Sequence, residues 1–257
     1  MRYNINQIIN ETINRFENCK EDLPYSYVPV EPIKNNIVSV CGEKIEIYVS
    51  SLLSDAWIEA YPQYAKIFED DIDFRNAVDS ASGKWLEPKY SNDKYCILLA
   101  CEKVSSSEDL IFTFAHELRH CYDFIKSIHV CNKTELPSDI SKFSLWSEFN
   151  AIYTDTVLRL YPYSKSELSF KDLSSYLGYK TADCIAGMYK SEEKNDYFAM
   201  RFAGTHRAIR DISEYFAPSP VFQLWRMIPS YIDERYPRIF YSENEMQKME
   251  YFDFSKQ

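Results

Sequence analysis

The chain has 257 residues, of which 46% are hydrophobic and 16% aromatic. This is enough to bury a full core as one large domain, or as a catalytic unit with a helical lobe. The formal net charge of −10 argues against a nucleic-acid-binding protein, which would carry clustered basic residues. With 5 glycines and neither GxGxxG nor GxxxxGK[ST], the chain also lacks the usual nucleotide-binding loops.

The N-terminal segment carries apolar residues at helical spacing. Ile5, Ile8, Ile9, Ile13 and Phe16 predict an amphipathic helix that docks on the rest of the protein. The segment lacks the basic start and continuous apolar stretch of a signal peptide. No window of the sequence approaches the roughly 18 apolar residues of a membrane span. We therefore expect a cytoplasmic protein with no membrane partner.

Four further segments predict strands. Residues 36–40 and 44–49 indicate a hairpin around a short turn. The apolar run 94–103 has strand length, and the turn residues at 92–93 suggest that it pairs with residues 84–90. An exposed edge of such a sheet would bind a substrate backbone by strand addition. The alternative is that the sheet only covers the core.

A helix is predicted over residues 106–125. Ser105, Ser106 and Ser107 supply an N-cap, and Glu108 and Asp109 favour the positive end of the helix dipole. At about 100° per residue, one side of this helix gathers five apolar side chains: Leu110, Phe114, Leu118, Cys121 and Ile125. His116 and His120 fall on the opposite side, so a helix packed through its apolar stripe would present both histidines away from that core.

His116, Glu117 and His120 form an HExxH sequence, the signature of zinc hydrolases. A helix stacks residues i and i+4 on one face, so both imidazoles can reach one ion at about 2.0–2.1 Å. Glu117 can then act as a general base toward a water acidified by the metal, and pass the proton to a leaving amine. The alternative is a surface helix that carries two histidines by chance.

A catalytic zinc site needs a third protein ligand, and Glu148 is the best candidate. It lies in a second predicted helix, residues 143–160, on the side away from an apolar stripe made of Leu145, Phe149, Ile152, Thr156 and Leu160. The segment 127–142 is long enough to turn the chain back antiparallel. Asp123 and Asp155 are candidates to accept the free ring N–H of a ligating histidine, or are solvated acids.

The segments 112–120 (FTFAHELRH) and 148–151 (EFNA) resemble the gluzincin-type metallopeptidases, in particular the ImmA/IrrE-like group of intracellular proteases. The resemblance covers about residues 94–160. It implies a zincin core with a small antiparallel sheet, a metal-binding helix and a glutamate helix, one Zn²⁺ ion held by His116, His120 and Glu148, and Glu117 as general base. Arg119 stands where that group usually has glycine.

Residues 161–168 indicate a linker, and the chain beyond them is expected to be mainly helical, including residues 197–216. In gluzincin-like sites a later helix supplies a donor that steadies the oxyanion. His206 is the candidate, with Arg210 one turn on. An ordinary histidine at the edge of the core is the alternative. His129 is expected on the surface, in the loop after the metal helix.

The 7 cysteines are odd in number and form no CxxC pair, which predicts free thiols rather than disulfides or a cysteine zinc site. A nucleophilic Cys121 beside His120 is disfavoured because Cys121 lies on the apolar side of its helix.

Together these patterns predict an α+β protein with a catalytic core over residues 1–160 and a helical lobe over residues 161–257. The expected activity is that of a zinc metallopeptidase hydrolysing a peptide or protein substrate. A regulatory binding module on a silent zincin scaffold and a non-peptidase zinc amidohydrolase stay open as alternatives.

Overall fold

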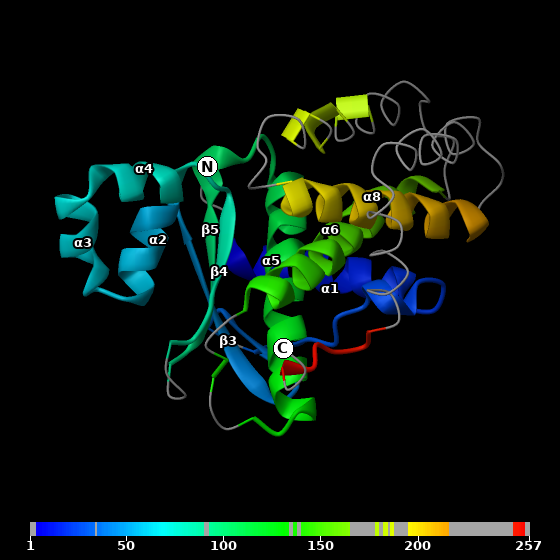
Figure 1. Ribbon diagram of the computed structural model, residues 1–257, viewed down its shortest axis with the longest axis horizontal. Helices are drawn as coiled ribbons and strands as arrows, with labels where there is room; N and C mark the ends of the chain where they lie inside the picture. Colours follow the sequence, from blue (N-terminus) through cyan, green and yellow to red (C-terminus); the bar gives the residue numbers. More distant parts are fainter. Residues whose placement is uncertain are drawn as a thin grey trace. The chain divides into compact units, whose positions relative to one another are not determined.

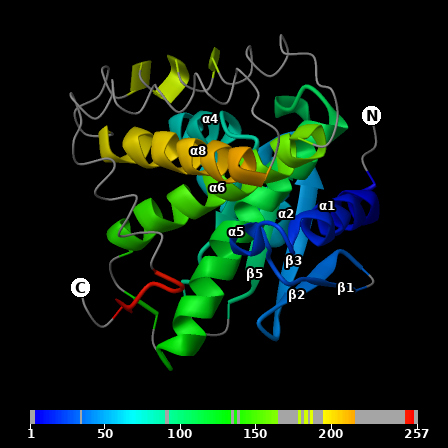
Figure 2. The same cartoon turned by 90° about the vertical axis from the view of Figure 1, so that its right-hand side faces the viewer.

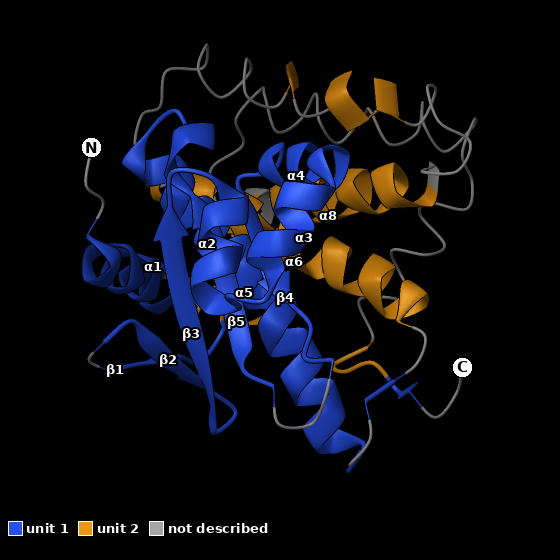
Figure 3. Cartoon of the chain, turned by 90° about the vertical axis from the view of Figure 1, so that its left-hand side faces the viewer, with its two compact units in different colours: residues 1–18, 28–137, 253–257 blue, residues 19–27, 138–252 orange. Residues whose placement is uncertain are grey.

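The computed structural model describes residues 4–33, 35–89, 93–133, 136–137, 140–164, 178–179, 182–184, 186–187, 195–215 and 249–254. The chain forms two compact units (Figure 3). Unit 1 comprises residues 1–18, 28–137 and 253–257, and unit 2 comprises residues 19–27 and 138–252. The domain boundary predicted after residue 160 falls inside helix α6 (Ser141–Ser164) of unit 2.

Unit 1 contains a five-stranded sheet in the order β1-β2-β3-β5-β4. Its strands are β1 (Glu31–Ile33), β2 (Ile37–Val40), β3 (Glu43–Ser50), β4 (Gly83–Leu86) and β5 (Tyr95–Ala100). The predicted hairpin is confirmed as the antiparallel pair β2 and β3, and the predicted pairing of β4 with β5 is also antiparallel. The expected all-antiparallel sheet is wrong, because β3 and β5 run parallel. The α+β class is confirmed.

The parallel pair arises from the helical crossover that joins β3 to β4. Residues 53–79 fold into α2 (Leu53–Ala60), α3 (Tyr64–Asp70) and α4 (Ile72–Asp79) on one side of the sheet, opposite α5 (Ser107–Val130) (Figure 1). Neighbouring residues of β4 accordingly pack on different layers: Leu86 joins the core under α2, while Trp85 contacts Phe124 of α5. Strand β5 lies between the layers, and its residues from Cys96 to Ala100 are fully buried.

Aromatic side chains hold the three short helices together. The rings of Trp57 and Phe68 lie 5.8 Å apart, and those of Phe68 and Phe74 stack at 5.3 Å. Each helix has only seven or eight residues, too few to be stable alone in water. Their stability therefore comes from the packing of these rings on one another and on the buried side chains of the sheet.

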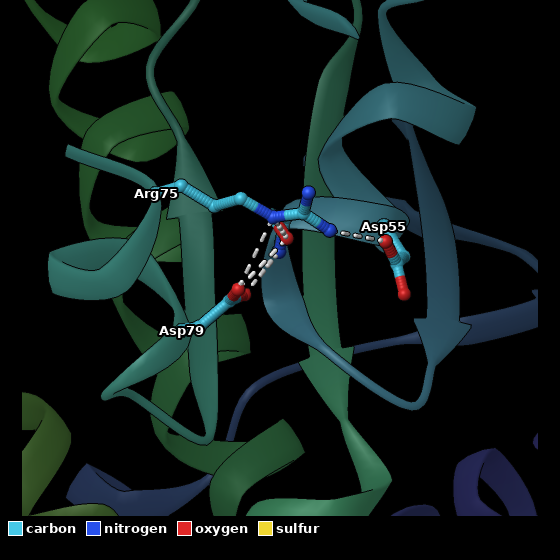
Figure 4. A network of polar contacts seen from close by, with 4 residues as sticks. Asp55, Arg75 and Asp79 are labelled. Atoms are coloured by element: carbon cyan, nitrogen blue, oxygen red, sulfur yellow. Dashed lines mark hydrogen bonds and ion pairs between the residues drawn. The ribbon is translucent and has the colours of Figure 1, made fainter. Parts of the chain in front are cut away.

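A polar network joins the end of α4 to the start of α2 (Figure 4). Asp79 accepts hydrogen bonds from the Ser54 N–H at 2.8 Å and the Ser54 hydroxyl at 2.9 Å. Leu52, the N-cap of α2, makes no side-chain hydrogen bond to the first turn. Asp79 instead accepts the Ser54 N–H, one of the first-turn N–H groups that have no partner within the helix. Arg75 completes the network with ion pairs to Asp79 at 3.7 Å and Asp55 at 3.3 Å.

Helix α5 begins as predicted. The Ser106 hydroxyl accepts the Asp109 N–H at 3.1 Å. All five residues of its predicted apolar stripe are buried. The helix continues to Val130, because the segment expected to turn the chain from residue 127 still carries buried apolar side chains such as Ile128.

The predicted N-terminal helix is also confirmed, as α1 (Ile5–Cys19). Ile8, Ile9 and Phe16 are buried along one side. Arg15 fastens the helix to the start of α5 through an ion pair with Glu108 at 2.7 Å, and its guanidinium lies 4.8 Å from the centre of the Phe112 ring.

Unit 2 is helical in its described residues, with η1 (Pro24–Ser26), α6 and α8 (Asn195–Tyr215). Helices α6 and α8 lie side by side (Figure 2). A Cβ atom on Gly204 would lie 2.6 Å from the Phe149 carbonyl oxygen, so glycine permits the close approach of the two helices. The predicted linker at 161–168 is wrong for its first four residues, which belong to α6; residues 165–168 lie outside the described residues.

Helix α6 is more deeply buried than an amphipathic pattern predicts. From Trp146 to Leu158 every residue is buried, including Glu148 and Asp155.

The predicted helix in the later part of the chain is confirmed as α8. Among the described residues, no helix has both the length and the apolar character needed to cross a membrane.

Candidate metal centre

The two histidines of the HExxH sequence converge on one point. His116 and His120 are one turn apart on α5, and their Nε2 atoms lie 3.1 Å from each other. The two rings meet edge to face, with centres 4.8 Å apart. In a tetrahedral zinc site with bonds of 2.0–2.1 Å, two ligand nitrogens are about 3.3 Å apart. The histidine pair therefore fits one edge of such a site.

Glu117 is held beside edge strand β4. The Trp85 backbone N–H donates to Glu117 Oε2 at 2.7 Å. On the other side of this strand the Ala100 N–H donates to the Ser82 carbonyl at 2.8 Å. Hydrogen-bonded and open pairs alternate along an antiparallel ladder, so the Trp85 N–H points away from β5, toward α5. The Glu117 carboxylate therefore accepts a hydrogen bond from a backbone N–H of β4 that is not bonded to β5.

Glycine at position 83 allows this contact. A Cβ atom there would lie 2.5 Å from Thr113 Cγ2 and 3.0 Å from Glu117 Cγ. A Cβ atom at 2.5 Å would force the Thr113 side chain or the backbone to shift. Glycine at position 83 therefore permits the close approach of the edge strand to the HExxH turn of the helix.

Arg119 and Asp123 form a buried ion pair on α5, at 2.9 Å between Arg119 Nε and Asp123 Oδ1. Their side chains are 5% and 1% exposed. The arginine that departs from the resembled sequence therefore has a structural partner four residues on. The suggestion that Asp123 supports a ligating histidine stays a prediction.

Glu148 lies in unit 2, with an arginine for a neighbour. Its Oε1 atom is 3.7 Å from Arg201 Nε, and its side chain is 8% exposed. Burial acts to lower the pKa of Arg201, but the nearby Tyr197 and Glu148 outweigh it and raise that pKa. The guanidinium therefore stays charged and offsets the negative charge of the carboxylate. An ionised carboxylate is also the form that ligates a metal.

His206 is buried on α8, with its ring stacked parallel to that of Phe202. It follows Gly204 by two residues, so it is turned by about 200° from the side of α8 that faces α6. Arg210, the neighbouring candidate, lies 3.9 Å from Asp211. The role of His206 as an oxyanion donor stays a prediction.

Asp155 and His129 are the remaining candidates, and the role of Asp155 beside a ligating histidine stays a prediction. Asp155 is buried and accepts a hydrogen bond from the Thr156 hydroxyl at 3.1 Å. His129 is exposed, as expected, but lies in the last turn of α5 rather than in a loop, with its Nε2 atom 3.2 Å from Glu43 Oε1.

All seven cysteines are free, which confirms that prediction. Burial raises the pKa of the Cys121 thiol well above its usual value, which further disfavours it as a nucleophile.

Sequence reasoning missed three neighbours of the candidate residues: Gly83 and the Trp85 N–H beside Glu117, and Arg201 beside Glu148. The two residues of β4 carry no pattern that relates them to Glu117 more than thirty positions away. Arg201 stands in a predicted helix among other arginines, and only the packing of α6 with α8 singles it out.

The chain was compared with protein-family models, with curated proteins and with solved structures, and none of the three comparisons found a match. We therefore infer function from the chemistry and geometry of its own side chains.

Proposed function

We propose that this protein is a zinc-dependent metallopeptidase that hydrolyses a peptide or protein substrate. The observation that carries the proposal is the convergence of His116 Nε2 and His120 Nε2 at 3.1 Å, beside a glutamate at the next position. In a helix that merely carries two histidines one turn apart, the acid beside the first would not need a backbone N–H from another element to fix it.

In this proposal Glu148 is the third ligand. Two imidazoles and one carboxylate are the protein ligands of a common type of catalytic zinc site, which keeps its fourth position open. His116, His120 and Glu148 are side chains that could hold a metal ion as a group. The zinc ion, when bound, would supply the Lewis acidity that polarises a carbonyl and makes water a better nucleophile. Arg201 would orient the Glu148 carboxylate from the side of α8.

Glu117 is the proposed general base. One oxygen, Oε2, accepts the Trp85 N–H, and we assign the proton transfer to Oε1. That oxygen would take a proton from the attacking water and return it to the leaving amine. The hydrogen bond from β4 keeps the carboxylate in one orientation, which removes a rearrangement from the reaction.

The proposal is tested by incubating the purified protein with an unstructured protein such as casein, with a peptide pool and with small aryl amides. We expect cleavage of the peptides, loss of cleavage after treatment with a zinc chelator, and recovery when zinc is restored. Cleavage of the small amides alone would favour an amidohydrolase. Binding of peptides without cleavage, under the same zinc-replete conditions, would favour a regulatory module.

A further inference from the structure

Unit 1 contains a pocket on the α2 side of the sheet, beyond the end of β4. Its walls include three aromatic side chains and three charged ones: Trp57, Tyr61, Tyr64, Glu87, Lys89 and Asp93. Leu86, the last residue of β4, also lines it, whereas Trp85 packs on the α5 side. The pocket and the HExxH sequence therefore lie on different faces of the same edge strand.

The aromatic rings form adjoining walls. The ring centres of Trp57 and Tyr64 are 5.2 Å apart, and those of Tyr61 and Tyr64 are 6.4 Å apart. The face of an aromatic ring attracts a cation, and Trp and Tyr are the strongest such rings. Several rings around one space are the arrangement that proteins use to hold an alkylammonium group.

A cation of the chain already occupies this position. Lys89 Nζ lies 5.7 Å from the centre of the Tyr64 ring. The Lys89 backbone N–H donates to Asp93 Oδ2 at 2.9 Å, which fixes the start of the lysine side chain at the rim. Lys89 itself is exposed, so the ammonium group of a partner can reach the same ring and compete with it. The Tyr64 ring thus already lies beside one ammonium group of the chain.

The carboxylates make the pocket selective for positive charge. Glu87 and Asp93 stand on its wall, in a chain whose formal net charge is −10. A neutral side chain would gain the contact with the rings but nothing from these acids. An anionic side chain would be repelled by both.

We propose that this pocket binds a lysine side chain of a partner peptide or protein, and that Lys89 fills its place when no partner is bound. The pocket lies beyond the end of β4, so a lysine side chain can enter it without strand pairing at the edge N–H that Glu117 accepts. The inference goes beyond the proposed peptidase activity and does not require a bound metal.

The test is a titration of the ¹⁵N-labelled full chain, followed by NMR at the Trp57 indole N–H. The probes are a five-residue peptide with a central lysine in an alanine background, the same peptide with norleucine or arginine, and acetyl-lysine methylamide. We expect the lysine peptide to bind most tightly and the norleucine peptide to cause no saturable shift. The peptide should also bind more tightly than the methylamide, because its neighbouring residues add contacts at the rim of the pocket.

Two substitutions at exposed positions should change the affinity in opposite directions. Lys89→Met removes the competing cation and should tighten lysine-peptide binding by about two- to fivefold, the range of one exposed cation–π contact. Glu87→Gln should weaken it by a similar factor. Lys66→Met and Glu69→Gln, at exposed positions of α3, are the matched controls and should change nothing.

Three results would overturn the inference. Equal binding of the norleucine peptide would show that charge plays no part. Equal binding of the arginine peptide, or of acetyl-lysine methylamide, would contradict a site for a lysine within a peptide. Unchanged affinity in Lys89→Met would show that Lys89 does not compete for the pocket. Because no zinc is needed, these outcomes are separate from any failure of the proposed hydrolysis.

Discussion

Glu117→Gln is expected to lower the rate of peptide hydrolysis by about 10²- to 10⁴-fold, the usual contribution of a general base. The amide cannot take up the proton that the attacking water must lose. Its carbonyl oxygen can still accept the Trp85 N–H, which is the contact that Glu117 makes at 2.7 Å. We therefore expect the fold and the zinc content of the variant to stay close to those of the wild type.

Steady-state assays on the same peptide pool give the rate, and circular dichroism confirms that the variant is folded. Glu102→Gln is the matched control, because Glu102 is an exposed glutamate near the start of α5. It should retain full activity. A Glu117→Gln variant with undiminished activity would rule out the assigned base, even if zinc were bound.

Asp123→Ala is expected to have a large effect on stability. Asp123 is 1% exposed and pairs with Arg119, which is 5% exposed. Its removal leaves a buried guanidinium without this carboxylate, and breaking a buried pair in this way costs about 3–5 kcal/mol. Urea unfolding followed by tryptophan fluorescence should show a much lower midpoint for unit 1 than in the wild type.

The control is the double variant Arg119→Met with Asp123→Leu. Replacement of both charges by apolar side chains of similar size is often neutral for stability, so this variant should recover most of the loss. If Asp123→Ala unfolds at the wild-type midpoint, the ion pair is not the stabilising contact that its burial suggests. If the double variant is as unstable as the single one, Asp123 has a further role on α5.

The parts of the fold that sequence predicted are those with a strong local pattern. Helices α1 and α5 carry apolar residues at helical spacing, and α5 also has an N-cap serine. The β2–β3 hairpin has a short turn between two runs of strand residues. Residues 53–79 received no prediction, because helices of seven or eight residues are marginal alone and depend on Trp57, Phe68 and Phe74 packing together. The parallel β3–β5 pair depends on that crossover and was missed with it.

For the candidate site, the residues one turn apart were predictable and the residues far apart were not. The i, i+4 spacing of His116 and His120 on a helix is enough to bring their nitrogens together, and the structure has them at 3.1 Å. The pairing of Arg119 with Asp123 has the same spacing, but the sequence analysis assigned Asp123 to a histidine ring N–H or to solvent and gave Arg119 no partner. The contact between Glu117 and Trp85 depends on how β4 packs on α5, which no local pattern encodes.

The most direct test of the proposed metal centre is the metal content of the purified protein. Plasma mass spectrometry would be applied to the wild type, His116→Ala, Glu148→Ala and Glu117→Gln after equilibration with zinc and removal of excess metal. We predict close to one zinc per chain in the wild type and in Glu117→Gln, and a large loss in His116→Ala and Glu148→Ala. A wild type without zinc under these conditions, or zinc content unchanged by Glu148→Ala, would contradict the proposed ligand set.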